Sequence, residues 1–393
     1  MSLIAVAEAQ ARLFALAPRV GAEVLPLAAA TGRWLAEPVI ARRSQPAADL
    51  SAMDGYALRF ADLGAPLRVI GESAAGRPFG ERLGAGEAVR IFTGAALPEG
   101  ADAILVQEEA ARDGDVLTLA GEGPGTPGRH IRRRGADFAE KATVLPAGAR
   151  LTPPALALAA AAGHGVLSVN RPIRVAIAAT GDELVPPGTP TGPAQLPEAN
   201  GVMLAALLAD LPVVIEDLGI LPDQLEAQAA AFALVSADLL VTSGGASVGD
   251  HDQVRPALLA AGATIDFWRI ALRPGKPLMA GRRGAMMVLG LPGNPVSAFV
   301  TAMLFVRPLI AAMAGAADPL PRRLTARLGA PLPANDGRED YLRGALVDGV
   351  ATAAKVQDSG MLTTLAGAGC LIVRAPHAPA AEAGETVEIV PLA

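Results

Sequence analysis

The feature that most constrains the fold is an alternation of apolar runs and helical patterns between Arg171 and Gly315. Each apolar run is short enough for a buried strand, and a polar turn and then a helix-like segment follow it. This order is typical of a doubly wound α/β domain with a parallel sheet. The sequence predicts strands at residues 173–178, 213–215, 238–241 and 286–289, and helices at residues 201–211 and 224–236.

Polar loops occur between these predicted strands and the helices that follow them. They read GDE at residues 181–183, LPD at 221–223, SGGASVGD at 243–250 and LPGNPVS at 291–297. The carboxyl ends of parallel strands lie along one edge of an open sheet, where ligands bind. We therefore expect the four loops to converge on one crevice.

The loop at residues 242–252 reads TSGGASVGDHD and directly follows an apolar strand. A strand that opens into small and glycine residues leaves backbone N–H groups unpaired, which is the chemistry of a phosphate cradle. Asp250 and Asp252 end this loop, and carboxylates beside an anion cradle suit either Mg²⁺ or proton transfer. The plainer alternative is a tight turn with solvated aspartates, but the neighbouring polar loops favour function.

Two cations lie in the sequence LRPGKP at residues 272–277. Two prolines and a glycine hold Arg273 and Lys276 in a stiff loop, which indicates an anion contact. Asn294 and Ser297 straddle the start of the helix after the last predicted strand, where hydroxyl and N–H groups bind oxyanions. Simple helix capping is the alternative for both residues.

Three further candidates precede Gly148. Asp54 lies before a glycine in SAMDGYA, and the alternative is a turn in which its carboxylate bonds the local backbone. Thr93 follows an apolar run at residues 88–92 and is either a turn residue or a polar contact. Arg132 belongs to HIRRRGAD, where guanidinium groups suit phosphate and other oxyanions, although a solvated surface is the usual explanation for a basic run.

The rest of the chain divides into segments with different residue patterns. The segment up to Ala41 is expected to be mostly helical, and a second helix is predicted at residues 153–162. Between them, short apolar runs at residues 67–70, 103–106 and 116–119 indicate a β domain. Residues 318–393 are interpreted as a small β-barrel or sandwich.

Composition excludes several classes of function. A net charge of −6 and a pI near 5.4 argue against a nucleic-acid-binding surface. Cys370 is the only cysteine, which excludes intrachain disulfides and multi-cysteine metal sites and fits a reducing cytoplasm. The apolar run at residues 296–317 contains Arg307 and Pro308, so we expect a buried helix rather than a membrane span.

Several motifs occur together in one order: SAMDGYA, IFTGAALPEGADAILVQEE, HIRRRGADF, TGDEL, SGGASVGD, RPGKP and LPGNPVSAF. This set resembles the molybdopterin molybdenumtransferases, the family of MoeA and the gephyrin E domain, over nearly the whole chain. The resemblance implies an elongated four-domain subunit that forms a homodimer. Its parts would be a helical domain at residues 1–42 with 149–170, an inserted β domain at 43–148, an α/β molybdopterin-binding domain at 171–317 and a C-terminal β-barrel-like domain at 318–393.

The same resemblance implies the reaction. Members insert molybdenum from molybdate into adenylylated molybdopterin and release AMP, with Mg²⁺ assisting, to give molybdenum cofactor. It implies catalytic roles for Asp54, Glu183, Asp223 and Asp252, and Mg²⁺ binding by Glu183 and Asp250. The substrate-binding residues it implies are Thr93, Arg132, Asp137, Ser243, Gly244, Gly245, Ser247, Gly249, Asp250, Arg273, Lys276, Asn294, Ser297, Arg343 and Ser359.

Two segments depart from the family pattern. Glu198-Ala199-Asn200 stands where many relatives have Asp-Ser-Asn, and Arg273 stands where lysine is common. The alternatives are a molybdopterin adenylyltransferase-type nucleotide reaction and a non-catalytic dimeric scaffold. The long N-terminal region argues against the first, and the retained acids argue against the second. Tungstate in place of molybdate stays open, and a molybdopterin adenylyltransferase and molybdoenzyme acceptors are the expected protein partners.

Overall fold

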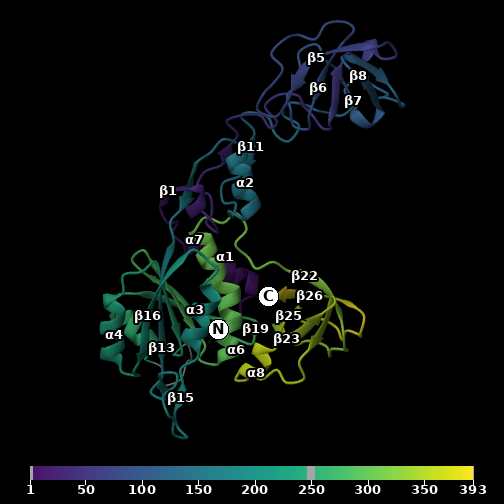
Figure 1. Cartoon of the computed structure of the whole chain (residues 1–393). Coiled ribbons are helices and arrows are strands. Elements are labelled where there is room, and N and C mark those ends of the chain that lie inside the picture. The colour runs from purple at the N-terminus through teal and green to yellow at the C-terminus, as the bar shows by residue number, and fades with distance from the viewer. Residues whose placement is uncertain (1–2, 246–252, 393) are drawn as a thin grey trace.

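The structure is a computed structural model that describes residues 3–245 and 253–392. The chain is elongated, with a β-rich domain at one end (Figure 1). A narrow segment that carries α2 (Pro153–Ala161) and β1 (Ala22–Pro26) joins this β domain to the rest. At the other end, the α/β domain and a C-terminal β domain flank the helices α6 (Pro295–Thr301) and α7 (Arg307–Met313).

The α/β domain is built on one six-stranded sheet with the order β16-β13-β17-β21-β20-β18. The first four strands are parallel and are the four that the sequence predicts. β20 runs antiparallel to its neighbours β21 and β18, and neither β20 nor β18 was predicted. β20 reads PLMAGRR and lacks the continuous apolar run of a buried parallel strand. The bounds are Ile173–Thr180 for β13, Val213–Leu221 for β16, Leu239–Ser243 for β17, Thr264–Arg269 for β18, Pro277–Arg283 for β20 and Met286–Leu291 for β21.

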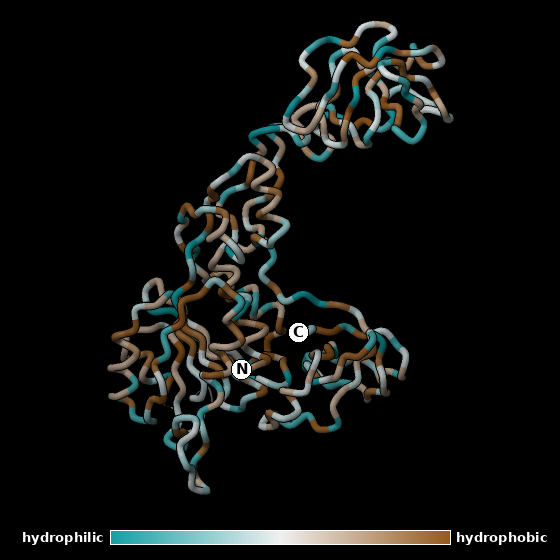
Figure 2. Tube along the Cα trace, in the orientation of Figure 1, coloured by the Kyte–Doolittle hydropathy of each residue, from teal (hydrophilic) through white to brown (hydrophobic). Residues whose placement is uncertain are grey.

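Helices cover both faces of this sheet, because successive strand residues point to opposite sides. On β13, Val175 and Ile177 join the core beneath α3 (Asn200–Leu208) and the α6–α7 run. Alternating residues such as Ala176 pack instead with α4 (Leu225–Leu234) and α5 (Val254–Ala260). Both predicted helices of this domain are thereby confirmed as α3 and α4. The central strands stand out in brown in Figure 2.

The run from α6 to α7 passes through a π-helical segment, η4 (Ala302–Val306). By length and hydropathy this run is able to cross a membrane, but 78% of it is buried inside the protein, so it is the core helix that the sequence predicts. Pro308 has no N–H, so the carbonyl of Leu304 loses its usual helical donor. The side chain of Gln10 replaces it: Nε2 donates to the Leu304 oxygen at 2.8 Å and ties α1 (Val6–Leu16) to the core helix.

The N-terminal segment is much less helical than the sequence predicts. α1 ends at Leu16, and β1 pairs antiparallel with β12 (Val166–Asn170). The prediction of helix up to Ala41 is therefore wrong. Pro18 has no N–H to continue the helix, and the side chains of β1 alternate between exposed and half-buried positions, as in a strand. The second predicted helix is confirmed as α2.

The β domain holds a six-stranded sheet with the order β7-β4-β6-β5-β9-β8. The three apolar runs that the sequence assigns to strands are confirmed as β5, β7 and β9. The bounds are Gly55–Leu58 for β4, Leu67–Ser73 for β5, Glu87–Ile91 for β6, Ala103–Val106 for β7, Ala110–Asp113 for β8 and Val116–Leu119 for β9.

The C-terminal domain is a closed barrel of five strands. β23 pairs with both β24 and β25, which closes the ring β23-β24-β22-β26-β25. The predicted barrel is thus confirmed over the sandwich. A short strand of the α/β segment, β19 (Leu272–Arg273), pairs with β23 and joins the two domains. The barrel bounds are Leu324–Leu328 for β22, Glu339–Val347 for β23, Val350–Ala353 for β24, Cys370–Arg374 for β25 and Thr386–Pro391 for β26.

Candidate active site

A cavity of about 900 Å³ opens at the carboxyl ends of the parallel strands. The loops after β13, β16, β17 and β21 all line it, which confirms the predicted convergence. Two further segments also contribute, the loop after β19 and the turn before α8 (Leu362–Ala366) of the C-terminal domain. Eight of the predicted site residues line the cavity: Glu183, Asp223, Ser243, Gly244, Gly245, Lys276, Asn294 and Ser297.

The glycine turn after β17 has a backbone that side chains disfavour. Gly244 has φ +94°, and a Cβ there would lie 2.5 Å from the carbonyl oxygen of Thr180. Gly245 also has a positive φ, +66°. Only glycine allows both this turn and its close approach to β13, so the two residues bring the backbone to the cavity. Four other predicted residues of this loop lie outside the described residues: Ser247, Gly249, Asp250 and Asp252.

Asn200, the first residue of α3, braces two of the cavity loops. Its Nδ2 donates to the Ser243 hydroxyl at 2.8 Å and to the Gly293 carbonyl at 2.7 Å. The Ser243 hydroxyl is thus already engaged by protein. The Oδ1 atom of Asn200 and the hydroxyl of Thr180 are buried at the cavity wall without a hydrogen-bond partner among the described residues.

The acids of the cavity repel one another. Asp223 is half-buried, and this burial together with the negative charges of Asp182 and Glu183 raises the pKa of its carboxyl. Gln228, which is fully buried, donates from Nε2 to Asp223 Oδ1 at 3.3 Å and to the Pro222 carbonyl at 2.9 Å. The carboxyl of Asp223 therefore keeps its proton to higher pH than an ordinary aspartate does.

The C-terminal domain reaches the cavity through the loop that carries Ser359. The hydroxyl of Ser359 accepts from Asn294 Nδ2 at 3.1 Å, and its carbonyl accepts from the Val296 N–H at 3.0 Å. These bonds place Ser359 against the start of α6, beside Ser297 and the cavity.

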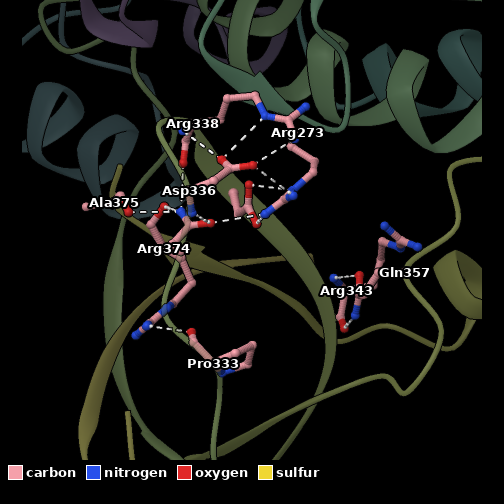
Figure 3. Close-up of polar contacts among 10 residues, drawn as sticks. Arg273, Pro333, Asp336, Arg338, Arg343, Gln357, Arg374 and Ala375 are labelled. Atoms are coloured by element: carbon pink, nitrogen blue, oxygen red, sulfur yellow. Dashed lines mark hydrogen bonds and ion pairs between the residues drawn. The ribbon is translucent and has the colours of Figure 1, made fainter. Parts of the chain in front are cut away.

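Arg273 and Arg343, two of the three arginines predicted to bind the substrate, differ in environment (Figure 3). Neither of them lines the cavity. Arg343 is 1% exposed and donates from Nη2 to the Asp358 carbonyl at 2.9 Å, while its Nε has no partner among the described residues. Its burial lowers the pKa of the guanidinium. Arg273, in contrast, pairs with two carboxylates of the C-terminal domain, Asp336 and Asp340.

The remaining predicted residues lie between residues 54 and 137, and none of them lines the cavity. Asp54 Oδ1 accepts from the N–H of Thr93 at 2.7 Å and from its hydroxyl at 2.8 Å, and these bonds lower the pKa of Asp54. Arg132 lies on β10 (Ile131–Arg132), which pairs with β3 (Leu50–Ser51) just before the Asp54 turn. Asp137 is exposed.

No group of three or more His, Cys, Asp or Glu side chains within residues 3–245 and 253–392 is arranged to hold a metal ion. Asp250, one of the two expected Mg²⁺ ligands, lies outside those ranges.

Comparisons with known families cover nearly the whole chain. Residues 4–163 match the MoeA N-terminal region (domain I and II), residues 176–312 a probable molybdopterin binding domain, and residues 325–392 the MoeA C-terminal region (domain IV). A molybdopterin molybdenumtransferase of Haemophilus influenzae is 39% identical over 379 residues, which cover 94% of this chain and 93% of that protein. This chain belongs to the molybdopterin molybdenumtransferase family.

Two other comparisons agree with this membership. Molybdopterin molybdenumtransferase 2 of Mycobacterium tuberculosis is 39% identical over 337 residues, which cover 82% of each chain. The crystal structure of the molybdopterin biosynthesis moeA protein from Pyrococcus horikoshii has a TM-score of 0.85 at 27% identity, over 99% of this chain and 100% of that one. Because the matches include the β domain and the barrel, the adenylyltransferase alternative is not favoured.

Sequence reasoning missed two residues that shape the sites of this molybdenumtransferase. Asn200 was not among the predicted binding residues, although a polar residue at the start of a helix beside a predicted crevice was an available signal. Arg90 lies between the rings of Tyr56 and Phe92 and donates from Nη1 to the Gly55 carbonyl at 3.1 Å. It supports the Asp54 turn. Nothing in the sequence of its strand indicates that Arg90 has this role.

Proposed function

We propose that this molybdenumtransferase inserts molybdenum from molybdate into adenylylated molybdopterin, releasing AMP and forming molybdenum cofactor. The observation that carries the proposal is the cavity itself, where a glycine turn, a proton-holding acid and a cation meet in a chain of this family. Each of these suits one part of the reaction: holding a phosphate, supplying a proton and attracting an oxyanion.

The glycine turn would hold the phosphate of the substrate. Residues at positive φ at the end of a parallel strand turn backbone N–H groups toward a ligand, and only glycine keeps that backbone uncovered. Gly244 and Gly245 meet this description. The Asn200 brace to Ser243 and Gly293 keeps the turn in place.

Molybdate is a tetrahedral dianion, so cations and hydroxyls select it. Lys276 and Ser297 line the cavity, and the hydroxyl of Ser359 is hydrogen-bonded to Asn294, another lining residue. Arg343 adds a buried positive charge that no described carboxylate neutralises by an ion pair. The charge of Asp358 acts on this guanidinium, but no described ion pair holds it. A buried cation without an ion pair favours an anion nearby, which supports its expected role in binding molybdate.

Protons have to reach the oxo groups that leave molybdenum as water. Asp223 is suited to this, since its raised pKa keeps its proton available at higher pH than an ordinary carboxyl. Glu183, exposed at the same wall, would act as the neighbouring carboxylate.

Mg²⁺ is the expected metal, and the donor chemistry fits it. The acids near Asp223 carry negative charge that no described cation pairs with, and carboxylate oxygens are hard ligands. We propose that Glu183 and Asp250 hold the ion, which would neutralise phosphate charge at the anhydride.

We also propose a homodimer in which the β domain of one chain completes the cavity of the other. The sheet of the β domain lies at the far end of the subunit from the α/β domain (Figure 1). Asp54 directly precedes strand β4 of this sheet, and Thr93 closely follows strand β6. Arg132 and Asp137 belong to the same predicted domain. A single rigid chain keeps the two sets apart, whereas a second copy can bring them together. The cytoplasm is the proposed location, and a molybdopterin adenylyltransferase and molybdoenzyme acceptors are the proposed protein partners.

Reconstitution tests the proposal. Purified protein, adenylylated molybdopterin, Mg²⁺ and molybdate are combined, and AMP release and active cofactor are followed. We expect molybdate-dependent AMP release that disappears in Asp54→Ala and Glu183→Ala. Tight binding of the adenylylated pterin without turnover would instead support a scaffold, and absence of binding would overturn the proposed substrate. Replacing molybdate by tungstate shows whether the pocket distinguishes the two oxyanions.

A further inference from the structure

The sequence RPGKP supplies two cations, and the structure gives them different surroundings. Lys276 lines the cavity, and no described residue forms an ion pair with it. Arg273 lies three residues earlier, on β19, and its side chain turns toward Asp336 of the C-terminal domain (Figure 3).

The guanidinium of Arg273 makes four hydrogen bonds to the C-terminal domain. Nε donates to Asp340 Oδ1 at 2.8 Å, and Nη2 donates to the other oxygen of the same carboxylate. Nη1 donates to Asp336 Oδ2 at 3.3 Å, and Nη2 also donates to Asn335 Oδ1 at 3.1 Å. A guanidinium has about five N–H donors, so little capacity is left for an oxyanion. Asp340 is only 4% exposed, and this burial strengthens its bidentate ion pair with Arg273.

The backbone of the same loop is held at both ends. Arg273 lies opposite Asp340 in the parallel pairing of β19 with β23, so the ion pair reinforces a strand contact between domains. Gly275, with φ +109°, packs against α6, where a Cβ would lie 2.5 Å from the Thr301 hydroxyl. Lys276 therefore follows a segment clamped between the barrel and α6, and this clamp directs it to the cavity.

We propose that Arg273 is a positioning residue that fastens the RPGKP loop to the C-terminal barrel, and that Lys276 is the cation of this loop that binds the oxyanion. This inference rests on the proposed function and changes one part of it, since the family resemblance assigns Arg273 to the molybdate pocket. Asp340 becomes a positioning residue as well, because it holds Arg273.

Steady-state AMP release by the full chain at varied molybdate separates the two roles. We expect Lys276→Ala to raise the KM for molybdate about tenfold or more, because it removes a charge-assisted contact. Arg273→Gln and Asp340→Asn should each raise this KM as well, by similar factors of about threefold, because both loosen the loop that presents Lys276 to the oxyanion. Since both remove the same interaction, the double variant should be no worse than either single one.

Different effects of Arg273→Gln and Asp340→Asn on the KM for molybdate would overturn the proposal. If Arg273 binds molybdate directly, Arg273→Gln raises KM as Lys276→Ala does, and Asp340→Asn leaves KM unchanged or lowers it by freeing the arginine. Arg273→Lys sharpens the result. This variant keeps the positive charge but loses the planar guanidinium. Activity should therefore be retained if residue 273 binds molybdate, and should be reduced if its role is to fasten the loop to Asp340.

Hydrogen exchange without substrate tests the fastening independently of catalysis. Arg273→Gln and Asp340→Asn should speed amide exchange in residues 271–277 and 336–341 about tenfold, and Lys276→Ala should not. Unchanged exchange in both variants would overturn the proposal even in an active enzyme. If wild-type protein shows no molybdate-dependent AMP release, the proposed function fails, while the exchange result still decides whether Arg273 fastens the loop.

Discussion

Two aspartates, one in each half of the proposed site, have opposite surroundings. Asp54 in the β domain receives two hydrogen bonds from Thr93, which lower its pKa. Asp223 in the α/β cavity is half-buried beside other acids, and its pKa is raised. The same residue type thus has a lowered pKa in one domain and a raised pKa in the other. The two domains supply different chemistry, so neither half is expected to suffice alone.

The strongest test of this comparison is to inactivate the two halves in different chains. Asp54→Ala and Glu183→Ala should each lose AMP release about a thousandfold. The two variants are then mixed under conditions that allow subunit exchange. Random pairing makes about half of the dimers mixed, and each mixed dimer has one intact site of two. About a quarter of wild-type activity should therefore return. Mixing Glu183→Ala with Asp223→Ala, two changes in the same half, is the control that should not recover. No recovery from the first pair, with mixed dimers shown by tag capture, would contradict a shared site.

Replacing one glycine in each half of the proposed site should give the next largest difference in activity. Gly244→Ala places a Cβ 2.5 Å from the Thr180 carbonyl, at a φ that disfavours side chains, so the turn has to move. A shift of about 1 Å at a reacting centre costs on the order of a hundredfold in rate. Gly80→Ala in the β domain is the matched control, because no atom lies within 4 Å of its added Cβ and its φ is unstrained. AMP release by both variants measures the difference, and equal activity would mean that the glycine turn does not hold substrate.

The cavity was predictable from sequence because topology alone fixes it. Once four apolar runs are recognised as parallel strands, the loops after them have to share an edge, whatever their exact conformation. The short strand β1 was missed for the opposite reason. Its partner β12 lies far along the chain, and pairing rather than local propensity decides its conformation.

The ion-pair partners of individual charged residues were not predictable in the same way. The sequence places Arg273 beside Lys276 and suggests one role for both. The acids that take up Arg273 lie more than sixty residues later in another domain, as the separations of 63 and 67 positions show. Tertiary packing decides which domain each side chain of a loop faces. A charged residue in a sequence motif therefore does not reveal whether its charge is free to bind a ligand.

The proton-holding role of Asp223 predicts a pH dependence. Because its pKa is raised, its protonated fraction declines as pH rises through that raised value, and the rate that uses this proton should decline with it. Asp223→Asn should lower kcat roughly tenfold to a hundredfold and remove this limb of the pH profile. Gln228→Leu deletes a hydrogen bond that lowers the pKa, so it should move the limb to higher pH. A limb that persists unchanged in Asp223→Asn would assign the proton to another group.

The smallest effect is expected at Thr93, and it separates ionisation from orientation. Thr93→Val removes the hydroxyl donor to Asp54 but keeps the backbone N–H, so the pKa of Asp54 should rise toward its ordinary value near 4. An acid of that pKa is still ionised at pH 7, so no activity should be lost there through protonation. Any loss at pH 7, which we expect to be about threefold, would then come from a less firmly oriented carboxylate. Thr93→Ser keeps the hydroxyl and should behave as wild type. A large loss at pH 7 in Thr93→Val, absent from Thr93→Ser, would instead mean that the hydroxyl itself contacts substrate.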